Sequence, residues 1–518
     1  MKKIIALFIF LATTAGLYAQ SADEAFAISQ ERYEGTARTM SMGNAFTALG
    51  GDLGALGINP ASSGVFRCSQ FTVTPTLTTT RSNVNYLGQT SNTVGTGLNM
   101  SNLGLVLTFD TGNYNGLLNY NFGIVYNKKN NFRSKMAAAG STDNSSMLSS
   151  LADQLGVVYN GVGITKESLE LSADPYTNYS ADLWPNILAW NAYVLAPLYL
   201  NPEKTDYMYI ASTENFDEGS QEIRIGGLLN QQFNRKTYGG VDEVTLNFGG
   251  NVNDFLYFGV NLNLNTLNQT TEEYYEEKAQ NSNNFQDGFV SMDNSYWLHT
   301  SGTGASFKFG VILTPVAGLR IGATLTTPTW YKLTDEWDWT MNTAFNNGNT
   351  YTQYSPTGRY TYRLTTPWRW RLGLAYTFSD RALISADFEN VNYSSMRYKN
   401  ENGSTGNFSL QNLEIKNDFH NASVLRLGAE VRVSRLISLR TGFQNYWPAA
   451  DGIPMLRVYS AGIGFNIGER ASIDVAYNRT STSANEFWLY EDYDNVLAPT
   501  GINRSGKSQV ACTFGFKF

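Results

Sequence analysis

Apolar and polar positions alternate along most of the chain from Ser69 onward. In stretches of roughly ten residues, every second side chain is aliphatic or aromatic, and the side chains between them are small, polar or charged. Residues 120–126, 260–264, 368–376 and 425–433 show this pattern, and residues 510–518 end on it at Phe518. A period of two predicts β-strands with one apolar face and one wet face.

The connections between these stretches are short and long in turn. Short turns on one side and long loops on the other are typical of a barrel in the outer membrane, with lipid outside and a wet lumen. The alternative, a soluble sandwich, explains neither the fully apolar faces nor the alternating connections. The sequence therefore predicts an all-β fold, a transmembrane antiparallel β-barrel of about 14 strands with both ends on the short-turn side. The expected long connections are 81–97, 133–239, 268–302, 334–360, 399–421, 448–454 and 481–507.

The stretch from Gly35 to Ser62 does not follow this pattern. It is rich in Gly and Ala, which let backbones approach closely, and Pro60 disfavours α geometry at Asn59. We expect short helical turns that break at Gly50 and Gly51 and stop at Asn59 and Pro60. Such a segment is too small to bury a core of its own, so we expect it to be a plug inside the barrel.

Three segments follow from these patterns. Residues 1–19 are expected to be a signal peptide, because Lys2 and Lys3 precede a short apolar run and a small residue, Ala19, precedes the cleavage site. Residues 20–67 form the plug. Residues 68–518 form the barrel, with a long outer loop at 133–239.

Three motifs near the predicted mature N-terminus resemble the plug, or hatch, of the FadL/TodX family of outer-membrane transporters for long-chain fatty acids and other hydrophobic compounds. They are Gly35–Arg38 (GTAR), Met42–Ala45 (MGNA) and Asn59–Ala61 (NPA). The resemblance implies a plugged barrel that captures ligand at its outer loops, passes it into the lumen and releases it sideways through the wall. The plug and gate residues on this basis are Arg38, Gly43, Asn44, Asn59, Pro60 and Ala61.

Proline at a strand position removes a backbone donor and weakens pairing locally. Pro75 lies within the first alternating stretch and is the candidate for a gap in the wall, although a simple bulge is the commoner role of such a proline.

Candidate ligand-binding residues come from the outer loop and the lumen. In the loop, 147–155 has helical spacing, and 184–200 is rich in aromatic and aliphatic residues, with Trp184, Trp190 and Leu195 as candidates. The alternative is that these groups pack into a small core of the loop itself. On the lumen side, a paired ladder of charges that holds the plug is favoured over an unpaired Arg369 or Arg371 that meets a ligand carboxylate. Strand parity points these charged residues inward: Lys308, Arg320, Arg369, Arg371, Arg426, Arg432, Arg440, Asp387, Glu389, Glu430 and Asp474.

The other motifs do not predict nucleotide binding, a metal site or a disulfide. Residues 501–508 (GINRSGKS) fit the letters of a phosphate-binding loop, but an alternating strand follows where that loop needs a helix. His299 and His420 are expected in outer loops, too far apart in the sequence to suggest a metal site. Cys68 and Cys512 are expected to be free thiols. The acidic run at 272–277 is expected to be a solvated surface, with divalent-ion binding as the alternative. We therefore expect no catalytic residues, no metal and no cofactor.

The functional prediction is passive transport of hydrophobic, fatty-acid-like molecules across the outer membrane of a Gram-negative bacterium, by a multi-pass monomer surrounded by lipid and lipopolysaccharide. The net charge of −7 argues against nucleic acid as a partner. Two alternatives remain open. One is a PorV-like docking or shuttle barrel for secreted proteins, which shares the small-residue plug. The other is a non-specific porin.

Overall fold

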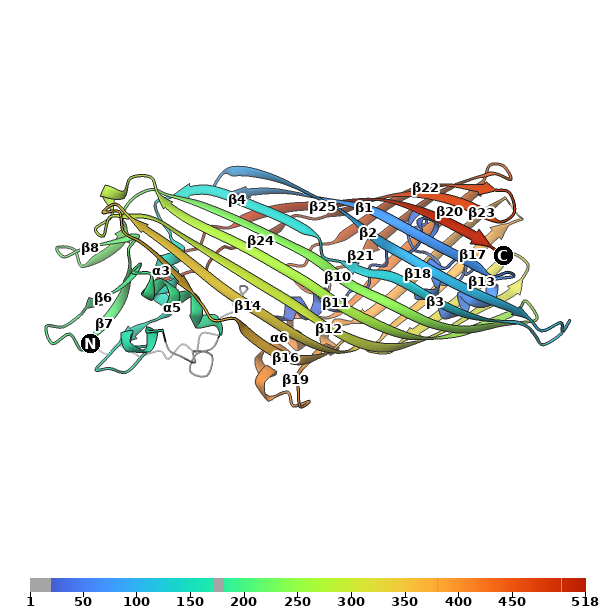
Figure 1. The fold of residues 1–518 in the computed structure, drawn as a ribbon, viewed down its shortest axis with the longest axis horizontal. Helices are drawn as coiled ribbons and strands as arrows, with labels where there is room; N and C mark the ends of the chain where they lie inside the picture. Colours follow the sequence, from blue (N-terminus) through green and yellow to red (C-terminus); the bar gives the residue numbers. More distant parts are fainter. Residues whose placement is uncertain (1–19, 172–180, 380, 495) are drawn as a thin grey trace, which may run out of the picture.

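The alternating stretches form one closed antiparallel barrel of 14 strands (Figure 1). The computed structural model describes residues 20–171, 181–379, 381–494 and 496–518, so the expected signal peptide at 1–19 lies outside the described residues. The wall strands are β1 (Gln70–Tyr86), β2 (Gln89–Asp110), β3 (Leu117–Asn131) continued by β4 (Ser134–Thr142), β10 (Leu229–Val252), β11 (Leu256–Ala279), β12 (Phe289–Val316), β13 (Leu319–Thr326) continued by β14 (Trp330–Phe345), β16 (Gly358–Thr365) with β17 (Arg369–Phe378), β18 (Ala382–Asn392) with β19 (Arg397–Asn400), β20 (Asn421–Arg432), β21 (Ile437–Tyr446), β22 (Leu456–Ile467), β23 (Ala471–Thr482) and β25 (Gly501–Lys517).

Closure joins the first strand to the last. Gln70 at the start of β1 lies opposite Lys517 at the end of β25, so both ends of the wall lie on the same side. Along β17, Trp370 and Leu372 are exposed, whereas Arg369 and Arg371 are buried inside. The predicted all-β barrel, apolar outside and polar within, is confirmed. Among the described residues, no helix is both long and apolar enough to cross a membrane.

The strands run further outward than the alternation predicts. The connection expected at 81–97 is a hairpin that closes at Leu87 and Gly88, both with positive φ. Likewise β11 continues to Ala279 and β12 begins at Phe289. Within the loop expected at 133–239, β4 and the first residues of β10 are part of the barrel wall instead. The outer stretches of β1 and β2 are rich in Thr and Asn, so they lack the apolar outer face of the lower wall. The apolar side chains of the outer stretches, such as Tyr86, Phe289 and Met292, are buried inside instead.

The remaining outer connection folds on the outer end of the barrel (Figure 1). The expected helix at 147–155 is α3 (Met147–Gln154). Around it lie β5 (Val157–Val158), η3 (Lys166–Leu169), η4 (Ala181–Leu183), α5 (Trp184–Asn191), β6 (Leu195–Tyr199), β7 (Tyr207–Ala211), β8 (Glu214–Asp217) and β9 (Glu222–Ile225). Smaller outer elements are η5 (Ser282–Asn284), β15 (Thr350–Tyr354), η6 (Tyr393–Ser395), η7 (Gly406–Phe408), α6 (Ser409–Asp418) and β24 (Asn485–Phe487).

The N-terminal segment lies within the barrel as short helical turns: α1 (Ala22–Ser29), α2 (Ala37–Ser41), η1 (Gly54–Gly57) and η2 (Pro60–Val65). Gly50 and Gly51 have positive φ and break the turns as expected. The expected stop at Asn59 and Pro60 is only half correct. The turn η1 does end before them, but Asn59 caps η2, whose first residue is Pro60, because proline suits the first position of a helical turn.

Wall glycines let this segment approach the strands. A Cβ added at Gly442 would overlap the backbone of Gly43, and one added at Gly259 would overlap Pro60. These two positions therefore require glycine for contact rather than for backbone freedom.

Candidate functional site

The plug is held to the wall by a buried network of charges. Glu31, on the plug after α1, pairs with Lys129 at 3.0 Å and with Arg371 at 2.8 Å. Glu389 on β18 accepts from Arg369, from Arg371 at 2.7 Å and from Arg426 at 2.8 Å. Burial acts to raise the pKa of Glu31, but Lys129 and the arginines hold it well below its usual value. Arg369 and Arg371 therefore belong to a paired ladder.

A second cluster joins α2 to the wall nearer the C-terminal strands. Arg38 pairs with Glu430 at 2.9 Å, and Arg440 bridges Glu430 at 2.6 Å and Asp474 at 2.5 Å. Of the other charges placed inward by parity, Lys308, Arg320 and Asp387 also bond the plug, at Gly57, Leu49 and Thr47 respectively. Arg432 is the exception: it is exposed, because β20 ends there.

The motifs that resemble the FadL/TodX plug form hydrogen bonds within the plug and between the plug and the wall. Asn59 Nδ2 donates to the Thr47 carbonyl at 2.6 Å, and Asn59 Oδ1 accepts from Ala61 N at 3.0 Å. The Pro60 carbonyl accepts from Asn247 on β10 at 3.0 Å. Asn44 has a φ of 54° and donates to the Tyr33 carbonyl at 2.8 Å. These residues fix the path of the plug.

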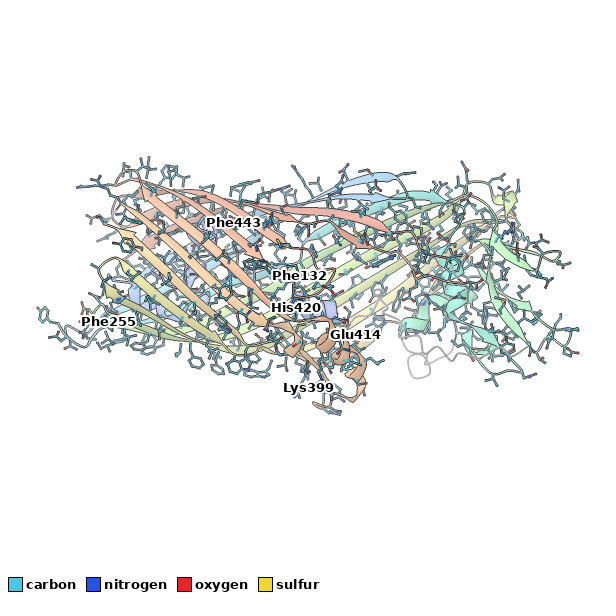
Figure 2. All side chains as sticks on the ribbon, turned by 180° about the vertical axis from the view of Figure 1, so that it is seen from behind. Phe132, Phe255, Lys399, Glu414, His420 and Phe443 are labelled. Carbon is cyan, nitrogen blue, oxygen red and sulfur yellow. The ribbon has the colours of Figure 1, made fainter. Side chains whose placement is uncertain are left out.

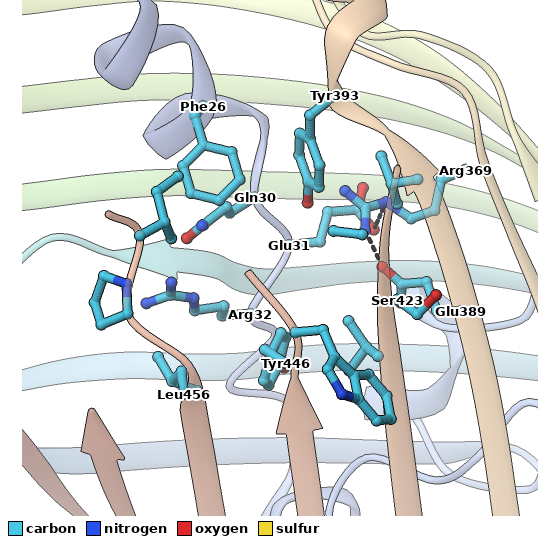
Figure 3. Close-up of a pocket in the computed structure, with 16 residues that line it drawn as sticks. Phe26, Gln30, Glu31, Arg32, Arg369, Glu389, Tyr393, Ser423, Tyr446 and Leu456 are labelled. Carbon is cyan, nitrogen blue, oxygen red and sulfur yellow. Dashed lines mark hydrogen bonds and ion pairs between the residues drawn. The ribbon is translucent and has the colours of Figure 1, made fainter. Parts of the chain in front are cut away.

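Arg32, like Glu31 beside it, is a charged plug residue that the sequence did not single out. Figure 3 shows Glu31 turned toward Arg369 and Glu389, whereas Arg32 points the other way. Its guanidinium carbon lies 6.0 Å from the centre of the Tyr446 ring, and its buried Nε has no hydrogen-bond partner among the described residues. Burial lowers the pKa of Arg32. Within the described part of the chain, Nε of Arg32 is therefore a buried donor that no acceptor satisfies.

Arg32 lines a cavity of about 40 Å³ between the plug and strands β18, β20, β21 and β22 (Figure 3). Ten of the other lining side chains are apolar or aromatic, namely Phe26, Val391, Tyr393, Ala422, Val424, Tyr446, Trp447, Ile453, Pro454 and Leu456. The remaining five are polar or charged, namely Gln30, Glu31, Arg369, Glu389 and Ser423. This volume holds a few water molecules and no long alkyl chain, so a larger ligand requires the plug to move.

The wall is irregular at Pro75. The pairing of β1 with β2 shifts register between Thr74 and Pro75, and neither residue has a partner in the register with β25. Side chains close this place, because Thr74 Oγ1 lies 2.8 Å from Thr513 Oγ1, which also accepts from Ala37 N of the plug.

A second irregularity is that three adjacent wall strands are each interrupted along their length. The breaks lie at 327–329 between β13 and β14, at 366–368 between β16 and β17, and at 393–396 between β18 and β19. Pro328 and Pro367 lie in the first two and offer no backbone donor. A small cavity of about 10 Å³ adjoins them, lined by Thr327, Pro367 and, on the plug, Ile28. The sequence carried this signal in Thr327–Thr329 (TPT) and Thr366–Trp368 (TPW).

The outer-loop candidates lie in the core of the folded loop. Trp184 is fully buried, Leu195 is 4% exposed, and Trp190 packs edge-on against the ring of Tyr209. The cluster also reaches the acidic run at 272–277. There Glu277 is buried and accepts from Ser146 Oγ at 2.6 Å, so the expected solvated surface is wrong for this residue.

The remaining motifs fall as follows. Residues 501–508 are part of strand β25, as expected. His299 lies on β12 rather than in a loop, because the strand extends outward, and His420 immediately precedes β20. Cys68 and Cys512 are free. Among the described residues, no group of His, Cys, Asp and Glu could hold a metal ion.

A closed barrel with an apolar outer band and an internal N-terminal plug defines the class of outer-membrane β-barrel transport proteins. Residues 234–513, more than half of the chain, match the family model described as outer membrane protein transport protein (OMPP1/FadL/TodX), and the chain belongs to this family. It is a hydrophobic-compound transport protein of the Gram-negative outer membrane.

Two solved structures show the same fold. A Pseudomonas aeruginosa FadL homologue is 12% identical with a TM-score of 0.53, over 95% of this chain and 100% of that one. The P. putida toluene transporter TodX is 13% identical with a TM-score of 0.51, over 94% and 99%. No curated protein matches the chain.

Proposed function

We propose that the protein is a passive transporter of long-chain, fatty-acid-like molecules and has no enzymatic activity. The observation that carries this proposal is the Arg32 cavity. Its lining is mostly apolar, and Arg32 forms no ion pair among the described residues, whereas the other charged lining residues, Arg369, Glu31 and Glu389, pair with one another. A carboxylate head would meet the guanidinium, and an alkyl chain would lie against the apolar lining. Each buried methylene contributes about 0.8 kcal/mol, so binding strengthens with chain length.

Passage requires the plug to shift. We propose that ligand is captured at the outer loops, moves into the lumen and displaces the plug segment next to Arg32, with Asn59–Ala61 as its fixed point. The outer-loop candidates Trp184, Trp190 and Leu195 would have to become accessible for capture, because they pack in the loop core.

For lateral release, the proposal places the exit at the breaks around Pro328 and Pro367, with Pro75 as the second candidate. The breaks are favoured because they adjoin a cavity that reaches the plug, whereas side chains close the wall at Pro75.

The PorV-like docking role is the second candidate. The observation in its favour is a folded outer surface with exposed aromatic and aliphatic side chains, including Tyr193, Tyr354 and Leu497. A non-specific porin is not favoured, because the plug bonds to the wall on several sides and fills the lumen.

Cellular uptake tests the proposal. Arg32→Gln removes the cation, and a lost charge-assisted hydrogen bond of about 1.5–3 kcal/mol lowers binding about tenfold or more. We expect uptake of a labelled long-chain fatty acid to fall accordingly, and uptake of the neutral alcohol of the same length to be unchanged. Arg32→Lys should restore part of the loss, and Arg435→Gln, at an exposed turn, is the matched control. Equal effects on acid and alcohol would contradict the role of Arg32.

A further inference from the structure

Three cationic side chains form a row on the outside of the barrel. Lys332 on β14 lies directly opposite Arg363 on β16, and Arg363 lies directly opposite Lys399 on β19. Their neighbours along the strands, including Leu333 and Tyr398, are buried in the lumen. Because side chains alternate across a strand, the three cations point away from the lumen. We call these three residues the cationic row.

Like charges placed directly opposite each other on a sheet repel. One carboxylate offsets the row: Glu401 Oε1 lies 2.7 Å from Lys332 Nζ. Arg363 and Lys399 have no side-chain hydrogen bond or ion pair within the described ranges. The row therefore carries an excess of positive charge that an external anion would relieve.

The row lies just outside the aromatic boundary of the apolar wall. Trp330, Trp368 and Trp370 are exposed on this side of the barrel, at 51%, 54% and 41%. Exposed aromatic residues mark the membrane interface of outer-membrane barrels. Lys332 follows Trp330 by two residues on the same face, roughly 7 Å further toward the outer end. That is the level of lipid head groups in the outer leaflet.

The surface beside the row suits a lipid more than an aqueous anion. Lys399 lies on a segment that protrudes sideways from the wall (Figure 2). On the same segment, Leu410 and Leu413 of α6 are exposed, at 68% and 47%. Below the row, the outward side chains of β17 are Trp370, Leu372, Leu374 and Tyr376. The cationic row above and the apolar surface below suit a molecule with an anionic head group and apolar chains, such as a phospholipid-like lipid.

We propose that the cationic row binds the phosphate groups of lipopolysaccharide in the outer leaflet. Arginine presents a planar fork that matches phosphate oxygens, and the lysines on either side add point charges. The acyl chains would lie along the apolar wall beneath. This site is outside the barrel and independent of the transported ligand.

Native mass spectrometry of protein extracted in mild detergent tests the site. In the variant Lys332→Gln/Arg363→Gln/Lys399→Gln, the amount of retained lipopolysaccharide should fall about tenfold or more below that of the wild type. The control Lys135→Gln/Lys204→Gln/Lys278→Gln removes the same charge from exposed positions outside the row and should retain it. Heat-modifiable mobility on a gel confirms that each barrel has folded. Equal retention by the two triple variants would overturn the proposal.

A gain-of-binding variant and a choice of lipids complete the test. Glu401→Gln removes the competing carboxylate and should increase retention, and decreased retention would contradict the proposal. In reconstituted nanodiscs, bisphosphorylated lipid A should bind and dephosphorylated lipid A should not. Equal binding of both lipids, full competition by inorganic phosphate, or retention of an acidic protein in place of lipid would each overturn the assignment to lipid phosphate.

Discussion

Glu31 is the residue on which docking of the plug depends most. Its carboxylate is 5% exposed and is shared by Lys129 at 3.0 Å, Arg369 at 3.3 Å and Arg371 at 2.8 Å. We expect Glu31→Gln to destabilise the docked plug by about 3–5 kcal/mol, because it leaves buried cations without compensation. Hydrogen exchange of plug amides should show this loss, whereas Glu203→Gln, at an exposed outer turn, should have no effect.

The pKa shift of Glu31 sets the pH range of this contribution. Because the pKa of Glu31 is lowered in the folded state, its stabilisation is present above the unfolded value of about 4.3 and is lost as pH falls through the folded value. The difference in plug protection between the wild type and Glu31→Gln should thus not change between neutral pH and about pH 5. Loss of that difference over the interval would contradict the assigned role.

Strand parity predicted the charged lumen residues well, because a wall strand has only two faces. It placed Arg369, Arg371 and Glu389 inward, and it failed for Arg432, where the strand ends. Arg32 could not be found in this way. It lies on an irregular stretch of the plug with no period. That its buried Nε has no partner in the described part of the chain follows only from the packing around it.

At the scale of elements, the plug is the part that must move. A Cβ at Gly104 of β2 would lie 3.2 Å from Cβ of Leu53 in the plug, close to the roughly 3.8 Å of a disulfide. In a background without Cys68 and Cys512, Leu53→Cys/Gly104→Cys should form a bridge that stops uptake of labelled fatty acid. A reductant should restore uptake.

The single-cysteine variants are the controls for this bridge, and they should transport with or without reductant. Full uptake by the cross-linked double variant would show that this part of the plug does not need to shift.

Element types were predictable where the pattern was strong. The alternation gave the strands, and the paired glycines at 50 and 51 gave the break in the plug. The outer extensions of β1, β2, β11 and β12 were missed because their polar runs resemble loops. The apolar side chains in them, such as Tyr86, Tyr275 and Met292, are buried in the outer core cluster, and that packing is not visible in the sequence. The helix α1 was missed because its contacts with the wall, rather than its short sequence, stabilise it.

At the scale of the whole molecule, the barrel separates three environments. The apolar face is directed outward, the plug lies in the lumen, and a folded cap lies at the outer end (Figure 1). The charge networks hold the plug within a wall whose strands are irregular at Pro75 and interrupted around Pro328 and Pro367. This arrangement favours passage of one hydrophobic molecule at a time over free diffusion of solutes.

Identification of what the protein carries tests the transport account most directly. The protein would be extracted from outer membranes into polymer nanodiscs without detergent, and bound molecules would be identified by native mass spectrometry. The account predicts a hydrophobic carboxylic acid bound within the barrel, and its loss in Arg32→Gln. A barrel without any small molecule, bound instead to a secreted protein in equal amount, would contradict transport and support docking.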